Sequence, residues 1–256
     1  NHDWVYTYTI EREPFADPAD GASTVACAAL AVAPALPTVV SNCGETLTPG
    51  APAMSGSYVD CEGTIIYTYL YTDCEGNTND WAYTYTIERE DFTMPANDGS
   101  TVACAALALA PTPPSVNDNC GGAITPTGPV TGGTYTTCEG TITYTWNYAD
   151  CEGNNHDWVY TYTIEREPFA DPADGSSTVA CAALAVAPAL PTVLSNCGEV
   201  LTPGGSSTGG TYDGCEGTII YYYGYSDCEG NTQEWAYTYT IEREDFTMPA
   251  NDGSTV

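Results

Sequence analysis

The chain has 256 residues and carries 34 acidic side chains against only four basic ones, which gives a formal net charge of −30. Nucleic acid and anionic membrane surfaces are therefore disfavoured as partners, because nothing in the chain replaces their counterions. No stretch is apolar and long enough to cross a membrane, and none resembles a signal peptide, so we expect no membrane insertion.

The segment 2–13 near the start of the chain returns three more times. Its tryptophan recurs every 77 residues, as Trp4, Trp81, Trp158 and Trp235, and such a fixed interval is the signature of a repeat array. Aromatic side chains stand at every second position of the segment, which predicts a strand with two unlike faces. We expect the closing strand of a preceding repeat at 1–13, immunoglobulin-like repeats at 22–90, 99–167 and 176–244, and a linker to a following repeat at 245–256.

The repeats alternate in kind. Residues 1–40 match residues 155–194 at all but two positions, and residues 81–102 match residues 235–256 without a difference. The full period is therefore a pair of repeats, 154 residues long. Near-identity of this kind indicates recent duplication of pairs, which suits a protein selected for its length.

The second repeat illustrates the expected order of strands. An alanine-rich run at 100–110 lacks a polar face and stops at a proline, so we predict an edge strand there rather than a helix. We further predict a weak strand near 123–125, a turn at Gly132 and Gly133, the strongest strand at 141–148, and a closing strand at Trp158. Several short strands with turns at this spacing are typical of a β-sandwich. The predicted fold class is all-β, with tandem immunoglobulin-like β-sandwich repeats of 77 residues and two disulfides each.

One face of the strongest strand is apolar and aromatic in all three repeats, whereas the opposite face varies. The face carries Ile65, Tyr67, Tyr69 and Tyr71, then Ile142, Tyr144, Trp146 and Tyr148, and finally Ile219, Tyr221, Tyr223 and Tyr225. Core packing tolerates little change in volume, so this face is the predicted core of each repeat.

Each repeat carries four cysteines at the same positions, with successive intervals of 16, 18, 13 and 30 residues. The chain has no CxxC pair and only two histidines, so the pattern indicates disulfides in an oxidising compartment rather than metal ligands. A unit of this size buries too little surface to be stable without cross-links. We therefore predict an extracellular or cell-surface protein.

The pairing of the cysteines follows in part from strand length. Twelve extended residues separate Cys61 from Cys74, roughly 40 Å at the rise of a strand. A disulfide needs Cα atoms within about 7 Å, so a Cys61–Cys74 disulfide is excluded if the strand is straight. If successive strands run up and down, the first and fourth cysteines share one end of a repeat and the second and third share the other. We therefore favour Cys27–Cys74, Cys43–Cys61, Cys104–Cys151, Cys120–Cys138, Cys181–Cys228 and Cys197–Cys215. Pairing of the first cysteine with the third and the second with the fourth remains the alternative.

The four arginines occupy one position of the repeat, each between two glutamates: Arg12, Arg89, Arg166 and Arg243. We interpret them as local ion pairs that end the closing strand rather than as anion sites. Because the chain opens on a closing strand, we also consider that strand 1–13 completes a neighbouring subunit, as a donor strand does in a fibre.

An acidic turn around a glycine is the one candidate metal site, because its oxygens have the spacing that a calcium loop uses. The full calcium-loop motif is absent, and a polar hairpin turn is the simpler interpretation. The candidate ligands are Asp73, Glu75, Asn77 and Asp80, with Asp150, Glu152, Asn154 and Asp157, and with Asp227, Glu229, Asn231 and Glu234. Asp17 and Asp20, with Asp171 and Asp174, lie in proline-containing segments between repeats where a cation could stiffen a joint. The equivalent positions Ala96-Asn97-Asp98 form a weaker ligand set, which argues against this second site.

No residues in the chain form a pattern expected for catalysis. His2 and His156 share one repeat position and have no second histidine nearby, so neither zinc nor a catalytic triad is predicted, and we expect no enzyme. The 20 tyrosines offer stacking surface for glycans, although core packing and strand propensity explain most of them.

Several motifs of the second repeat together resemble the hyalin repeat (HYR) type of immunoglobulin-like module. They are Val102-Ala103-Cys104, Asp118-Asn119-Cys120-Gly121, Cys138-Glu139-Gly140-Thr141 and Asp150-Cys151-Glu152-Gly153-Asn154, with counterparts in the other repeats. The chain is similar to the tandem HYR-like repeats of very large secreted proteins in Bacteroidetes-type bacteria. The resemblance implies an extracellular stalk or adhesin without catalytic residues.

From these observations we predict an extracellular structural repeat protein that forms a stalk or filament on a bacterial surface and whose partners are other copies of itself. No cofactor is required, with calcium as a candidate. The alternative is a calcium-dependent adhesin that binds glycans or a partner cell surface.

Overall fold

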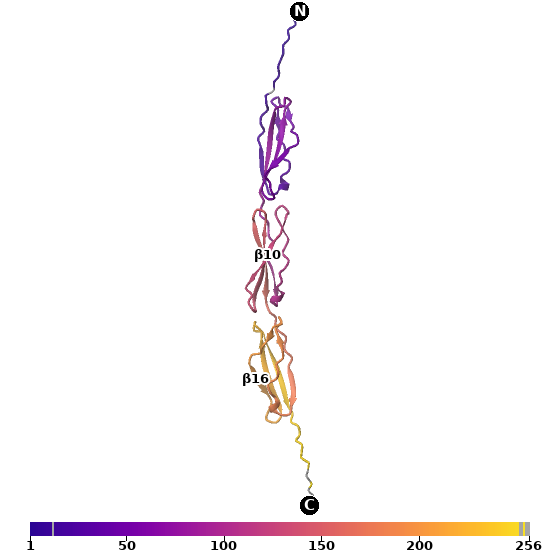
Figure 1. The fold of residues 1–256 in the computed structure, drawn as a ribbon, viewed down its shortest axis with the longest axis vertical. Helices are drawn as coiled ribbons and strands as arrows, with labels where there is room; N and C mark the ends of the chain where they lie inside the picture. Colours follow the sequence, from indigo (N-terminus) through magenta and orange to yellow (C-terminus); the bar gives the residue numbers. More distant parts are fainter. Residues whose placement is uncertain (12, 251–252, 254–256) are drawn as a thin grey trace. The chain divides into compact units, whose positions relative to one another are not determined.

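The computed structural model describes residues 1–11, 13–250 and 253. Its strands fall into three groups that follow the sequence, one for each predicted repeat (Figure 1). The all-β fold class is thereby confirmed. The chain divides into two compact units, and neither coincides with a repeat: one contains residues 1–96, 112–128 and 146–158, and the other contains residues 97–111, 129–145 and 159–256.

The three repeats contain the same elements in the same order. The first has β1 (Gly21–Val25), the short 3-10 helix η1 (Ala28–Leu30), β2 (Val39–Val40), β3 (Thr46–Leu47), β4 (Ala53–Gly56), β5 (Gly63–Thr72) and β6 (Thr78–Ile87). The second has β7 (Asp98–Val102), η2 (Ala105–Leu107), β8 (Val116–Asn117), β9 (Ala123–Ile124), β10 (Thr127–Gly133), β11 (Gly140–Ala149) and β12 (Asn155–Ile164). The third has β13 (Gly175–Val179), η3 (Ala182–Leu184), β14 (Val193–Leu194), β15 (Val200–Leu201), β16 (Ser206–Gly210), β17 (Gly217–Ser226) and β18 (Thr232–Ile241).

Each repeat forms one four-stranded and one two-stranded sheet. The larger sheets have the orders β1-β6-β5-β4, β10-β11-β12-β7 and β13-β18-β17-β16, and the smaller ones are β2-β3, β8-β9 and β14-β15. In the first repeat, β5 and β6 form a long antiparallel hairpin in which Gly63 faces Ile87. The first strand, β1, joins β6 in parallel, so that Val25 also pairs with Ile87. The residues that follow β1 therefore lie at the same end of the repeat as the start of β5.

The aromatic face of β5 is buried in the core of the first repeat, as predicted. Tyr67, Tyr69 and Tyr71 are 7 %, 5 % and 0 % exposed, and they pack with Trp81 of β6 and Val39 of β2. The two-stranded sheet thus covers the aromatic face of the larger one. In the third repeat, Val193 of β14 packs in the same way with Tyr223, Tyr225 and Trp235.

The segments between repeats are tied to the repeat that follows them. Phe15, Phe92 and Phe169 are buried, and each lies a few residues before the first strand of its repeat. The indole N–H groups of Trp81, Trp158 and Trp235 donate to the carbonyls of Ala19, Ala96 and Ala173, each at 2.9 Å. The segment 90–95, which the sequence suggests is a linker, is therefore anchored by Phe92.

Two predicted elements differ from the structure. The strand predicted over 100–110 ends at Val102 and is followed by η2, because the alanine-rich run turns before it reaches Pro111. The turn predicted at Gly132 and Gly133 lies inside β10, which continues to Gly133. Among the described residues, no helix is long and apolar enough to cross a membrane.

Residues 1–11 form no strand in this structure. Residues 1–10 have the same sequence as the whole of β12. In its sheet β12 has β11 and β7 as neighbours, but within the described part of the chain residues 1–11 have no such neighbours. Trp4, Tyr8 and Ile10 are accordingly 86 %, 80 % and 83 % exposed. Their role as the closing strand of another repeat stays a prediction. Arg12 and most of the predicted linker beyond residue 250 lie outside the described residues.

Candidate functional site: the disulfide-linked junctions

Four disulfides join consecutive repeats, and each lies within one compact unit. Cys27–Cys120 and Cys61–Cys151 form what we call the first junction, and Cys104–Cys197 and Cys138–Cys228 form the second. Their Cα atoms lie 5.6 or 5.7 Å apart, in the usual range for a disulfide. In each junction, the first and third cysteines of one repeat are bonded to the second and fourth cysteines of the next.

The predicted pairing inside each repeat is therefore wrong, and so is the alternative. None of Cys27–Cys74, Cys43–Cys61, Cys104–Cys151, Cys120–Cys138, Cys181–Cys228 and Cys197–Cys215 is formed. The prediction assumed strands that run up and down in sequence, but β1 is parallel to β6. Cys27, which follows β1, consequently lies at the same end as Cys61, which precedes β5. Both bond forward to the next repeat rather than to each other.

Four cysteines have no disulfide partner among the described residues: Cys43, Cys74, Cys181 and Cys215, all exposed. Cys43 and Cys74 are the second and fourth cysteines of the first repeat. Cys181 and Cys215 are the first and third cysteines of the third repeat. The expectation of two disulfides inside each repeat is thus replaced by two at each junction.

The turn that carries the fourth cysteine is closed by its own aspartate. In the second repeat, Asp150 Oδ1 accepts the backbone N–H groups of Glu152 and Asn154 at 3.0 and 2.9 Å, and Oδ2 accepts the Asn154 amide at 2.8 Å. The same bonds recur around Asp73 and Asp227. Donation from the Asn77 side chain is the main cause that holds the pKa of Asp73 below its usual value.

The calcium candidates are therefore largely engaged in protein contacts. Glu152 and Glu229 accept the backbone N–H groups of Arg89 and Arg166 at 2.8 Å, across the first and second junctions. Asp157 accepts the Asn147 amide at 2.7 Å. No group of three or more His, Cys, Asp or Glu side chains is placed to share a metal ion in the described part of the chain.

The first junction also contains an ion pair. A guanidinium nitrogen of Arg89 lies 2.5 Å from Asp118 Oδ2, and both side chains are mostly buried. Asp118 Oδ1 meanwhile accepts the backbone N–H groups of Cys120 and Gly122 at 2.9 and 2.7 Å. Burial alone would raise the pKa of Asp118, but these bonds and Arg89 hold it below its usual value.

The second junction also contains a loop closed by a side chain and an ion pair, but different residues make them. Ser195 Oγ accepts the N–H groups of Cys197 and Glu199, at 3.3 and 3.1 Å. Glu199 then binds Arg166 through both carboxylate oxygens, at 2.6 and 3.0 Å, and this contact lowers the pKa of Glu199. The prediction that these arginines pair with flanking glutamates is wrong, because Arg89 and Arg166 each reach a carboxylate of the following repeat.

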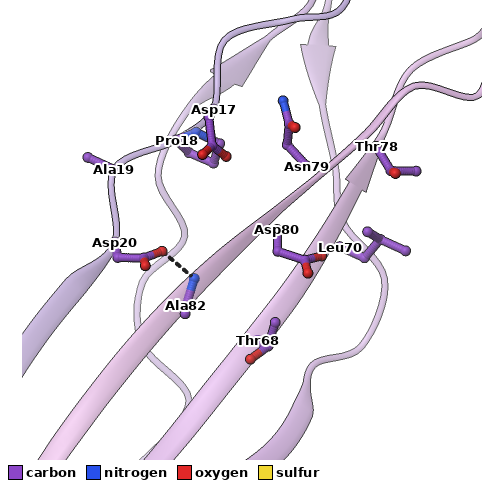
Figure 2. A pocket seen from close by; sticks show the side chains of 10 residues that line it. All are labelled: Asp17, Pro18, Ala19, Asp20, Thr68, Leu70, Thr78, Asn79, Asp80 and Ala82. Carbon is purple, nitrogen blue, oxygen red and sulfur yellow. Dashed lines mark hydrogen bonds between the residues drawn. The ribbon is translucent and has the colours of Figure 1, made fainter.

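An acidic hollow of about 670 Å³ lies beside β6 (Figure 2). Its walls include Asp17 and Asp20, from the segment before β1, and Asp80 on β6. Asp20 accepts the backbone N–H of Ala82 at 2.8 Å, the dashed line in Figure 2. Asp20 is therefore held by the strand that it borders, although it is exposed, as Asp17 and Asp80 are.

Among the residues that the structure describes, neither histidine belongs to a group of three or more His, Cys, Asp or Glu side chains that could hold a metal ion. His156 contacts both carboxylate oxygens of Asp91 at 2.9 Å, and its ring packs edge-on against Phe92. His2 is exposed in the segment before the first repeat.

A family model described as "HYR-like domain with 4 cysteines" matches residues 15–87, 92–164 and 169–241. Each match begins at the buried phenylalanine that precedes the first strand. No curated protein matches the chain.

Solved structures show only a weak likeness. The PcdhgB3 EC1-4 structure has a TM-score of 0.24 and 11 % identity, over 73 % of this chain and 58 % of that one. The human CDH23 EC21-23 structure has a TM-score of 0.25 and 10 % identity, over 69 % of this chain and 73 % of that one.

Proposed function

Because the chain belongs to the family of HYR-like domains with four cysteines, we propose that it is an extracellular structural segment that carries tension, as part of a stalk or filament on a bacterial surface. We assign the chain to a bacterial surface because its sequence resembles the repeats of large secreted Bacteroidetes proteins. Eight cysteines in disulfides support an oxidising, extracytoplasmic location.

The observation that carries this proposal is a covalent route that bypasses most of the polypeptide. Starting at residue 1, the shortest route follows the chain to Cys27, crosses to Cys120, continues to Cys138, crosses to Cys228 and then runs to the end. It contains roughly 75 residues, which at the rise of an extended chain span about 260 Å. The complete chain of 256 residues would span about 880 Å.

Such cross-links matter when a chain is pulled from its ends. Without the cross-links, each repeat that unfolds would add its full extended length, and the chain would lose stiffness. With them, β2 to β8 and β11 to β17 lie outside the loaded route, so unfolding of these strands adds no length. The Arg89–Asp118 and Arg166–Glu199 ion pairs add non-covalent contacts at the same junctions.

Single-molecule force spectroscopy tests the proposal directly. The oxidised chain, attached through its two ends, should reach a contour length of about 260 Å. After reduction and alkylation of all cysteines, it should extend to about 880 Å. An oxidised chain that extends to the full length without reductant would overturn the proposal.

A matched variant makes the test quantitative. Serine at Cys27, Cys120, Cys138 and Cys228 removes one disulfide from each junction and leaves Cys61–Cys151 and Cys104–Cys197. The shortest route then contains roughly 165 residues, so the expected contour length is about 570 Å. The three lengths together identify which disulfides carry tension.

A further inference from the structure

We propose that the four unpaired cysteines are halves of further junctions with repeats of the same type: Cys43 and Cys74 bond to the first and third cysteines of another repeat, and Cys181 and Cys215 bond to the second and fourth cysteines of another repeat. The inference rests on the proposed function and names the partner of the same sites. In both observed junctions, the first and third cysteines bond to the second and fourth cysteines of the next repeat. The unpaired set contains one complete pair of each type.

The two unpaired cysteines of the third repeat lie at the same end of it, so both can bond to one partner. Parallel pairing of β13 with β18 places Val179 beside Ile241, and Gly217 pairs with Ile241 from the other side. Cys181 and Cys215 each lie two residues from this row. They therefore repeat the arrangement that Cys27 and Cys61 have in the first junction.

Other contacts at this end are also in place. Arg243 donates to the carbonyl of Gly214 at 3.0 Å. Arg166 donates in the same way to Thr137, at 3.2 Å, in the second junction. The end of the third repeat thus keeps the local structure of a junction.

The two cysteines of the first repeat sit on loops that are already formed. Around Cys43, Ser41 Oγ accepts the N–H groups of Cys43 and Glu45 at 3.3 and 3.2 Å, as Ser195 does around the bonded Cys197. Around Cys74, Asp73 closes the turn with the bonds that Asp150 makes beside the bonded Cys151. These loops need no rearrangement to present their thiols.

A partner inside the same repeat does not fit this pattern. Cys120 and Cys151, the counterparts of Cys43 and Cys74, bond to separate cysteines of the preceding repeat and not to each other. The partner that supplies a first and a third cysteine with the right spacing is another repeat of this type. In solution, a second copy of the chain presents that pair at its third repeat and so supplies such a partner for the test.

Formation of each bond is a two-electron oxidation. One cysteine thiolate attacks the disulfide of a small-molecule oxidant, forms a mixed disulfide and releases one thiol. The partner thiolate then attacks the mixed disulfide, which forms the protein disulfide and releases the second thiol. Two protein thiols thus lose two protons and two electrons, and the oxidant is reduced to two thiols.

The test uses the full chain at high concentration in a buffer of oxidised and reduced glutathione. We expect a ladder of multimers on non-reducing gels that collapses to monomer with reductant. Because the chain has no lysine, peptides for mass spectrometry are best made with a glutamate-specific protease. They should contain Cys43 linked to Cys181 and Cys74 linked to Cys215.

Two complementary variants make the result specific. The Cys43→Ser/Cys74→Ser and Cys181→Ser/Cys215→Ser chains should each stay monomeric, and an equimolar mixture should give a dimer and nothing larger. Homodimers of either variant, or a wild-type chain that stays monomeric with four titratable thiols, would overturn the inference. Mapping of the four internal disulfides in the same samples shows separately whether the proposed function survives, because that function depends only on those bonds.

Discussion

The guanidinium of Arg166 binds the carboxylate of Glu199 through two hydrogen bonds, of 2.6 and 3.0 Å. In the first junction, Asp118 binds Arg89 through one oxygen, Oδ2, from a position that corresponds to Ser195. The position that corresponds to Glu199 is Gly122, and a Cβ there would lie 2.7 Å from Asp118 Oδ2. The alternating repeats therefore exchange Asp and Gly for Ser and Glu as a pair, which keeps both the loop hydrogen bonds and the ion pair.

This exchange predicts a compensating double variant. Asp118→Ser keeps an acceptor for the loop but removes the partner of Arg89, and we expect a loss of about 2 kcal/mol in the free energy of unfolding, the range for a buried hydrogen bond to a charged group. Adding Gly122→Glu should restore most of that loss. Urea denaturation followed by tryptophan fluorescence measures each step.

Gly122→Glu alone serves as the control, because its side chain meets Asp118 and places two carboxylates beside one arginine. It should be less stable than the double variant. If the effects of the two substitutions are additive, the two positions do not act as a pair.

The repeat period, the all-β class and the core face of each repeat are readable from the sequence because they depend on local pattern. Tyr67, Tyr69 and Tyr71 stand at alternate positions, and only burial explains why that face keeps its volume in every repeat. The phenylalanines before each repeat were missed as core residues, since Phe92 lies in a proline-bearing segment that looks like a linker. Its recurrence at every period was the available signal.

The disulfide pairing was not accessible in the same way. Exclusion of Cys61–Cys74 is correct within one repeat, but Cys61 does bond to a fourth cysteine, that of the next repeat. In a periodic sequence every repeat carries the same cysteines, so the sequence does not show whether a cysteine bonds within its own repeat or to a neighbouring one. Only the parallel register of β1 and β6 shows which end of the repeat Cys27 occupies. The ion pairs of Arg89 and Arg166 were misassigned for the same reason.

Acid should weaken the turns that carry the fourth cysteine. Burial alone would raise the pKa of Asp227, but donation from Asn231 and from the backbone of the turn holds it below its usual value. A carboxylate with a lowered folded-state pKa stabilises above its unfolded value of about 3.9, and the contribution is lost as the pH falls through the folded-state pKa. The urea midpoint should therefore change little from pH 7 to 5 and fall below about pH 4.

The matched variant for this effect is Asp227→Asn, which keeps one acceptor oxygen but removes the charge. It should be less stable than wild type at pH 7 by about 1–2 kcal/mol. The difference should shrink as the pH falls below about 4, where the aspartate of the unfolded chain takes up a proton before that of the folded chain. A constant difference across the pH range would contradict the assignment of Asp227.

Glycine is required where the edge strand of each sheet ends. Gly210 has φ +119°, and a Cβ there would lie 2.1 Å from the carbonyl oxygen of Thr218. Gly210→Ala should therefore lower the free energy of unfolding by about 1–3 kcal/mol, from strained backbone. Gly205→Ala is the control, because its Cβ would meet nothing within 4 Å and should change stability by less than about 0.5 kcal/mol. Equal effects would show that the Gly210 conformation is not needed.

Calcium should have little effect on this chain, which separates the structural proposal from a calcium-dependent adhesin. Asp73, Asp150 and Asp227 each use both carboxylate oxygens to accept N–H groups of their own turns, and calcium needs six to eight oxygens at one place. We expect the melting temperature of the EDTA-treated chain to rise by less than about 1 °C in millimolar calcium, whereas a bound ion stabilises the folded state in proportion to RT ln(1 + [L]/Kd). Magnesium at equal ionic strength is the control for screening of the −30 charge. A calcium-specific rise of several degrees, abolished in the Asp73→Asn/Asp150→Asn/Asp227→Asn variant, would contradict this prediction and favour the adhesin.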